Sequence, residues 1–275
     1  MLEDGKITGR QLILLIVLSR IIVTFTYLPI SDTPPRNQDV WISELLSFPI
    51  HILLVLPVYI LSQRFKGCSI TQASEIIFGK IGKIIGAMYT WFFLHITAIV
   101  LRQFGEFLSS VPYPETPIIV FISGITLFAA FALRNGLEVI SRVGEIITPI
   151  VIGSIILVVA LVAKDMDFKV LKPILEEGFI PVLYGGAVVA TRTTEILFIS
   201  MLFPYLNRRK SAKKVILVSF ILLTILAPII TVSVLTTFGV QQTINRTFPF
   251  FSTIRIISVA NFLERIDALH LGIWV

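Results

Sequence analysis

Long apolar runs recur along the whole chain, and short polar or basic stretches separate them. A helix needs roughly 20 mostly apolar residues to cross the hydrocarbon core of a membrane. Only helices and closed barrels satisfy their backbone hydrogen bonds in lipid, and these runs are too long and too uniformly apolar for barrel strands. The pattern therefore predicts an all-α multi-span membrane protein. We expect eight spans, at Gln11–Leu28, Val40–Leu61, Ile84–Leu108, Pro117–Phe131, Val139–Ala163, Ile180–Pro204, Val215–Phe238 and Phe251–Val275.

The composition supports this prediction. Hydrophobic residues make up 55% of the chain and charged residues only 15%, whereas a soluble domain is nearer a quarter charged. No soluble domain fits between the spans, so we predict that residues 1–275 form a single transmembrane domain. The last apolar run lacks the polar or basic tail that usually closes a membrane protein. We therefore expect a C-terminally truncated sequence, with eight spans as a lower bound.

The distribution of lysine and arginine predicts the orientation. Cytoplasmic segments of membrane proteins carry an excess of these residues. With the N-terminus in the cytoplasm, thirteen basic residues fall in inside segments and five in outside loops. The outside five are Arg36, Lys164, Lys169, Lys172 and Arg246. The basic stretch Asn207–Lys214 then faces anionic membrane lipid, and the absence of accompanying aromatic residues argues against nucleic acid as a partner.

Catalytic and metal-binding motifs are not found in the sequence. His51, His95 and His270 lie in expected spans without metal-ligand spacing, and Cys68 is the single cysteine. No nucleotide-binding loop, nucleophile motif or zinc-protease motif occurs. We therefore expect neither an enzyme nor a bound metal or cofactor.

Five arginines lie in or at the edges of spans, namely Arg20, Arg102, Arg192, Arg255 and Arg265. A charge at a helix centre costs at least ~2.5–3.5 kcal/mol on insertion scales, so each arginine should face the bundle interior, reach the interface or find a carboxylate.

Acidic residues stand close to three of these arginines. Glu106 follows Arg102 by four positions and Glu195 follows Arg192 by three, spacings that place side chains on one helix face. Asp267 and Glu264 flank Arg265. Such pairs either neutralise each other within a packed bundle or contribute to a functional site. Glu44 has no local partner, so it lies near the interface or titrates.

Several spaced motifs resemble those of the endospore germination permeases. They are "QDVWISELLSF" (Gln38–Phe48), "VPYPETPIIVFISG" (Val111–Gly124), "RNGLEVISRVGEIITPI" (Arg134–Ile150) and "ERIDALHLGIW" (Glu264–Trp274). The similarity runs from the first expected span to the last residue. It implies a permease-like membrane subunit of a nutrient germinant receptor, related to the amino acid–polyamine–organocation transporters.

The resemblance also implies a fold and a ligand site. Members of the family are expected to have about ten spans in two inverted repeats, with the first and sixth helices interrupted at mid-membrane. The adjacent glycines Gly185 and Gly186 are then where the sixth helix opens, and with Tyr184 and Ala187 they form our first-choice ligand-facing set. The alternative is that these small residues allow close helix packing.

The first span is less clear. It lacks a central glycine, so an interruption there depends on the hydroxyls of Thr24 and Thr26, and a continuous helix is an equal alternative. Arg192 departs from the family pattern, in which a small or apolar residue is expected near the glutamate at Glu195.

Three functions are compatible with these features. The first is a receptor subunit in the spore inner membrane that senses an amino acid or similar nutrient and acts with an A-type membrane subunit and a C-type lipoprotein. The second is a proton- or sodium-coupled amino acid transporter. The third is a scaffold subunit with a vestigial pocket. The resemblance favours the first.

Overall fold

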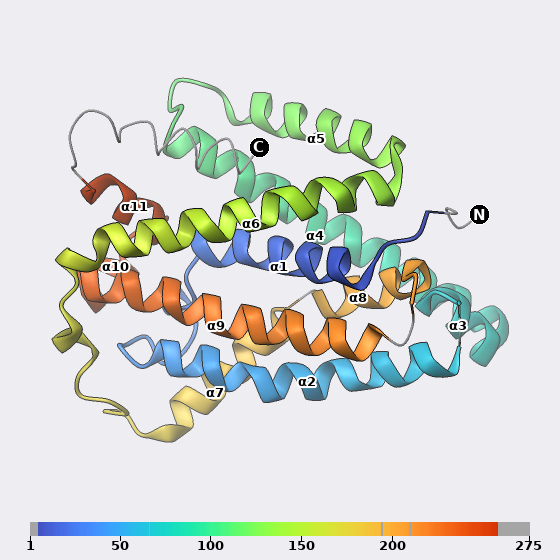
Figure 1. Ribbon diagram of the computed structural model, residues 1–275, viewed down its shortest axis with the longest axis horizontal. Coiled ribbons are helices and arrows are strands. Elements are labelled where there is room, and N and C mark those ends of the chain that lie inside the picture. The colour runs from blue at the N-terminus through green and yellow to red at the C-terminus, as the bar shows by residue number, and fades with distance from the viewer. Residues whose placement is uncertain (1–4, 66, 194, 209–210, 258–275) are drawn as a thin grey trace.

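The computed structural model describes residues 5–65, 67–193, 195–208 and 211–257, and nearly all of its elements are helices (Figure 1). The α-helices are α1 Gly9–Thr26, α2 Val40–Arg64, α3 Ile70–Phe78, α4 Gly82–Ser110, α5 Ile118–Arg134, α6 Gly136–Val162, α7 Phe179–Thr191, α8 Glu195–Leu202, α9 Ala212–Phe238, α10 Val240–Ile244 and α11 Pro249–Ile256. Short 3-10 turns, η1 to η5, lie at Pro29–Ser31, Gly79–Ile81, Ala163–Asp165, Phe168–Leu171 and Phe203–Tyr205. The expected all-α multi-span class is confirmed.

Among the described residues, five helical segments are long and apolar enough to cross a membrane. They are Val40–Arg64, Ile70–Ser110, Gly136–Asp165, Phe179–Tyr205 and Ala212–Phe238, and they cover the second, third, fifth, sixth and seventh expected spans. The helix at the fourth expected span, Ile118–Arg134, is apolar but shorter. The eighth expected span lies largely outside the described residues, which end at Ile257.

The long helices lie side by side, and α1 is central among them (Figure 1). This helix packs against α6 and α9, while α2 packs against α7 and α9. Leu12, Ile16 and Ile21 on α1 are almost fully buried. Leu12 and Ile16 share one face, whereas Ile21, nine positions after Leu12, lies on the opposite side, so α1 is buried on more than one face. Large apolar side chains on α4 and α5 are exposed instead, for example Trp91 at 73% and Leu127 at 73%. An apolar outer surface suits contact with lipid.

The connecting segments lie at the two ends of the bundle, and successive ones lie at opposite ends, as the expected spans predict. At one end the backbone of Ile7 pairs with that of Tyr205 at 2.9 Å, joining two expected inside segments. At the other end the N–H of Asp167 donates to the carbonyl of Thr236 at 2.8 Å, and the N–H of Leu175 donates to Asp39 Oδ1 at 3.0 Å. Expected inside and outside segments are therefore segregated, while the direction of the bundle in the membrane stays a prediction.

Candidate ligand-binding site

The glycine pair lies within a continuous helix. Helix α7 runs through Gly185 and Gly186 without interruption to Thr191, and both glycines are buried. A Cβ atom on Gly185 would lie 1.8 Å from the carbonyl oxygen of Pro34, and one on Gly186 would lie 3.1 Å from the carbonyl oxygen of Ser43. The expected opening of the helix at this pair is therefore wrong. Here the small residues allow α7 to approach the chain around Pro34 and helix α2 closely, which was the alternative interpretation.

The sixth expected span is interrupted two turns later. Helix α7 ends at Thr191 and α8 begins at Glu195. The hydroxyl of Thr191 donates to the carbonyl of Val188 at 3.0 Å, and that of Thr193 donates to the carbonyl of Val189 at 3.2 Å. The N–H of Thr193 also turns back to the carbonyl of Ala190 at 3.2 Å. Threonine hydroxyls compete for helix carbonyls in this way, so Thr191 and Thr193 are a local reason for the interruption.

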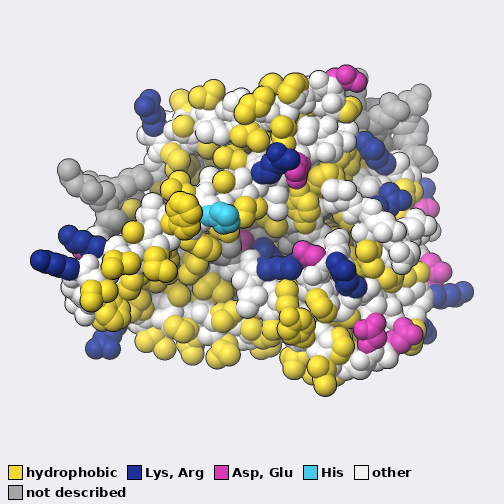
Figure 2. Space-filling model, turned by 180° about the vertical axis from the view of Figure 1, so that it is seen from behind, with side chains coloured by type: hydrophobic (Ala, Val, Ile, Leu, Met, Phe, Trp, Pro, Cys, Tyr) yellow, Lys and Arg dark blue, Asp and Glu magenta, His cyan; other side chains and the backbone are white. Residues whose placement is uncertain are grey.

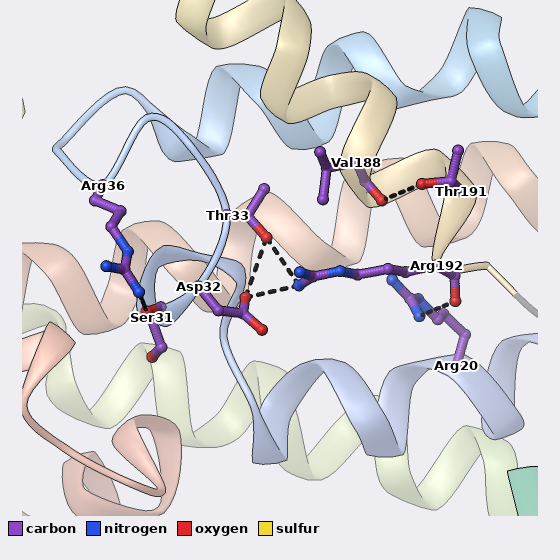
Figure 3. A network of polar contacts seen from close by, with 8 residues as sticks. All are labelled: Arg20, Ser31, Asp32, Thr33, Arg36, Val188, Thr191 and Arg192. Atoms are coloured by element: carbon purple, nitrogen blue, oxygen red, sulfur yellow. Dashed lines mark hydrogen bonds and ion pairs between the residues drawn. The ribbon is translucent and has the colours of Figure 1, made fainter.

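Arg192 caps the end of α7 and reaches away from Glu195. Its Nη1 lies 2.7 Å from Asp32 Oδ1 and 3.0 Å from Thr33 Oγ1, both in the segment after η1 (Figure 3). The expected neighbouring pair of Arg192 and Glu195 is therefore replaced by a pair between distant segments. The physical reason is that the chain leaves the helix at Arg192, so a spacing of three no longer places the two side chains on one face.

Arg20 approaches the interruption from α1. Its Nη1 points to the backbone carbonyl of Arg192 at 3.5 Å (Figure 3). The carbonyls at the C-terminal end of a helix carry partial negative charge, which favours a nearby guanidinium. Glu195 opens the first turn of α8, is only 5% exposed, and its Oε2 has no hydrogen-bond partner among the described residues.

A groove of about 720 Å³ extends from this interruption towards the expected outer end of the bundle. Its charged lining residues come from separate elements: Arg20 from α1, Asp32 from the segment after η1, Arg192 and Glu195 from the interruption, and Arg246 from the segment after α10. Apolar side chains of α1, α4 and α7 form the walls, namely Val23, Ile96, Ile99, Val100 and Val189. In Figure 2 hydrophobic side chains are spread over the visible face, with a few charged side chains at mid-height and others at the two ends.

Arg246 is held mainly through its flat face. Its guanidinium carbon lies 4.0 Å from the centroid of the Phe238 ring. Its Nε is buried and has no hydrogen-bond partner in the described part of the chain. Cation–π packing of this kind keeps a guanidinium in place while part of its donor set stays available.

A second, much smaller cavity of about 50 Å³ lies deeper in the bundle and shares Arg20 with the groove. Glu44, Ser47 and His51 of α2 line it together with Thr193. His51 Nε2 and Thr193 Oγ1 are 2.5 Å apart, and the imidazole stacks on Phe220 with ring centroids 4.9 Å apart. The hydroxyl of Thr231 on α9 donates to Glu44 Oε1 at 2.8 Å. Glu44 is 2% exposed, so it lies in the bundle interior, while its depth in the membrane stays a prediction.

The residues of the predicted ligand set are only partly near these two spaces. Thr24 lines the small cavity, and its hydroxyl donates to the carbonyl of Arg20 at 3.1 Å. The hydroxyl of Thr26 donates to the carbonyl of Ile22 at 2.7 Å, so α1 is continuous to its last residue. Tyr184 is 61% exposed. Neither space is lined by Tyr184, Gly185, Gly186 or Ala187. A ligand role for these residues stays a prediction.

The other predicted intramembrane charges divide in the same way. Arg102 Nε and Glu106 Oε1 on α4 lie 2.8 Å apart, as their spacing predicts. Arg265 and Asp267 lie outside the described residues. Asp32, Thr33 and Arg246 lie in expected outer loops and were not predicted as site residues. An acidic residue in a short outer loop that follows the first span is the signal that could have drawn attention to Asp32.

Comparison with known proteins gives the family. The family described as "Spore germination protein", the spore permeases, matches residues 6–275. Spore germination protein KB of Bacillus subtilis is 31% identical, with 98% of this chain and 73% of the relative covered. Spore germination protein YndE of the same organism is 26% identical, with 98% and 76% covered. Spore germination protein XB of Bacillus anthracis is 25% identical, with 87% and 67% covered.

None of the solved structures matches this chain. The family match extends over nearly the whole sequence, and the helical bundle with its interrupted sixth expected span agrees with the membrane protein that the resemblance implied. The chain belongs to the spore germination permease family.

Proposed function

We propose that this protein is the nutrient-binding membrane subunit of a spore germinant receptor, and that the groove beside the interrupted helix binds a small zwitterion such as an amino acid. The observation that supports this proposal is the lining of the groove. Three arginines and two carboxylates from separate elements meet in one space, between apolar walls. A zwitterion needs both signs of charge within a few ångströms.

The two ends of an amino acid fit different parts of this lining. Arg20 and Arg246 are not members of the ion pairs found among the described residues, so their guanidinium groups can receive a carboxylate. Glu195, which has an unpartnered buried oxygen, can receive an ammonium group. Charge-assisted hydrogen bonds of this kind are about twice as strong as neutral ones and give orientation as well as affinity. A groove of about 720 Å³ is in the range of small-molecule sites.

The family supports a proposed cellular setting, and the distribution of lysine and arginine supports a proposed orientation. We place the protein in the spore inner membrane, with the N-terminus in the cytoplasm, and expect it to act with an A-type membrane subunit and a C-type lipoprotein. Binding in the groove then signals to these partners.

A groove-filling variant tests the site. Val100→Trp on α4 introduces a large ring into the groove, whereas Leu94→Trp on the same helix introduces the same ring at a position outside the groove lining. Both side chains are exposed, at 46% and 63%, so neither change overfills a core. We expect full-length Val100→Trp in lipid nanodiscs to lose at least tenfold in affinity for a radiolabelled amino acid selected from a panel of the common amino acids. Leu94→Trp should bind like the parent.

The same panel separates sensing from transport. Parent protein in proteoliposomes should bind the selected amino acid without accumulating it in the lumen, and spores that carry Val100→Trp should need a higher concentration of it to germinate. Accumulation in the lumen against a gradient contradicts the receptor proposal and indicates the coupled transporter. Equal binding by Val100→Trp and the parent contradicts the groove as the site.

A further inference from the structure

Glu44 is a buried carboxylate with one hydrogen bond. Its Oε1 accepts from the fully buried hydroxyl of Thr231, and its Oε2 has no hydrogen-bond partner among the described residues. None of the ion pairs found among the described residues includes Glu44. An ionised carboxylate in the bundle interior that lacks a close counter-charge is costly by several kcal/mol. A functional reason for its presence is therefore expected.

The cavity of about 50 Å³ gives this carboxylate access to water. One water needs roughly 10–15 Å³ of such space, so the cavity has room for a few molecules. Thr24, Ser47 and Thr193 line it. Their hydroxyls donate to backbone carbonyls, and the hydroxyl oxygens can still accept a hydrogen bond from water. The cavity shares Arg20, Val23 and Tyr27 with the larger groove, so the two spaces adjoin on the side from which a proton can approach Glu44.

A proton fits this cavity better than a metal ion. No group of three or more His, Cys, Asp or Glu side chains suited to a metal occurs in the described residues. The guanidinium of Arg20 lines the same cavity, and its positive charge opposes a second fixed cation. A proton needs one carboxylate oxygen and no coordination shell.

Arg20 connects Glu44 with the groove because it lines both spaces. The other titratable groups that line this cavity are His51, on the same helix, and Tyr27, which follows α1. Glu195, at the start of α8, lines the groove and interacts electrostatically with Arg20. His51 is bonded to Thr193 and stacked on Phe220. The parts of α7 and α9 that line the cavity carry no titratable side chain. Arg20 is therefore the cation that Glu44 and a ligand in the groove share.

We propose that Glu44 is a proton-binding site linked to the nutrient groove through Arg20. When the carboxylate of a nutrient enters the groove, the guanidinium of Arg20 moves towards it and away from Glu44. Glu44 Oε2 then takes a proton from cavity water, and the water regains a proton from the solvent. Binding of one zwitterion is therefore accompanied by uptake of one proton. The link rests on the proposed function, whereas the proton site itself does not.

Infrared spectroscopy of the full-length protein in lipid nanodiscs tests both parts. The carbonyl stretch of a protonated carboxyl group is resolved from that of a carboxylate. In a pH titration of the ligand-free protein we expect an acid band that is absent in Glu44→Gln and present in Glu106→Gln, the control at the carboxylate paired with Arg102. Addition of the selected amino acid at constant pH should strengthen this band, and a weakly buffered solution should show proton uptake. Thermal stability of each variant is measured alongside. Glu44→Asp keeps a carboxyl group and should retain an acid band, and it replaces Glu44→Gln in the comparison if that variant is unstable.

The outcomes separate the two proposals. An acid band that is the same in the parent and in Glu44→Gln overturns the proton site. A Glu44 band that the bound amino acid leaves unchanged overturns the link through Arg20. If no amino acid of the panel binds, the proposed function fails and the link fails with it, while the band of the ligand-free protein still decides the proton site.

Discussion

Replacement of Gly185 by alanine should destabilise the bundle, although alanine is the better helix former. Alanine in a helix interior is favoured over glycine by up to about 1 kcal/mol. A Cβ at Gly185, however, would lie 1.8 Å from the carbonyl oxygen of Pro34 and 2.6 Å from Ser43 Oγ. Real Cβ contacts are essentially never shorter than 3.0 Å, so the backbone must separate by about 1.2 Å, which is 3.0 minus 1.8. Overpacking of this kind typically costs about 1–3 kcal/mol, so the steric cost exceeds the helix gain.

The neighbouring glycine and a distant one provide the comparison. At Gly186 the shortest contact of a Cβ is 3.1 Å, so alanine there requires a shift of only a few tenths of an ångström. At Gly153 on α6, nothing lies within 4 Å of the Cβ position. Apparent melting temperatures in detergent can be measured by fluorescence-detected size exclusion. We expect the highest value for Gly153→Ala, a lower one for Gly186→Ala and the lowest for Gly185→Ala. If Gly185→Ala and Gly153→Ala have the same melting temperature, the close approach of α7 to Pro34 is wrong.

Two further predictions concern the orientation and the interior. In a Cys68→Ser background, a cysteine at Lys169 should react with an impermeant maleimide in intact cells and a cysteine at Lys213 only after permeabilisation; the opposite result reverses the predicted topology. Thr193→Val removes the hydroxyl beside His51 Nε2 and should cost about 1–3 kcal/mol, the usual cost of an unsatisfied buried polar group. Thr191→Val is the control, because that exposed hydroxyl bonds a helix carbonyl and contacts no imidazole, and equal melting of the two variants contradicts the reasoning.

Most helix positions within the described residues were predictable because the expected spans there are long apolar runs, and lipid leaves the backbone few alternatives to a helix. The interruption was not predicted correctly. Gly185 and Gly186 permit an opening, but they equally permit close packing, and the choice depends on where the chain around Pro34 lies. That position depends on how distant segments pack, and residue spacing along one helix does not predict it.

The charge pairs show the same limit. Arg102 and Glu106 pair as expected because both lie within α4, where a spacing of four places them on one face. Arg192 follows the end of α7, and its carboxylate comes from Asp32, 160 positions earlier in the chain. Local spacing therefore predicts pairs inside continuous helices and fails at an interruption, which is also where the groove forms.

Exchange of the two charges decides whether the pair of Arg192 and Asp32 only supports the fold or also takes part in binding. Arg192→Asp and Asp32→Arg should each lower the melting temperature, since each places like charges beside one another. The double variant restores opposite charges across the same gap and should recover the part of the stability that the pair provides, which for exposed pairs is about 0.2–1 kcal/mol. Nutrient affinity should stay low in the double variant, because the groove would then present a carboxylate at the end of α7, beside the guanidinium of Arg20, and compete with the nutrient for it. Recovery of both stability and affinity would show that the pair is structural only, and it would leave Arg20 and Arg246 as the groove's carboxylate-binding arginines.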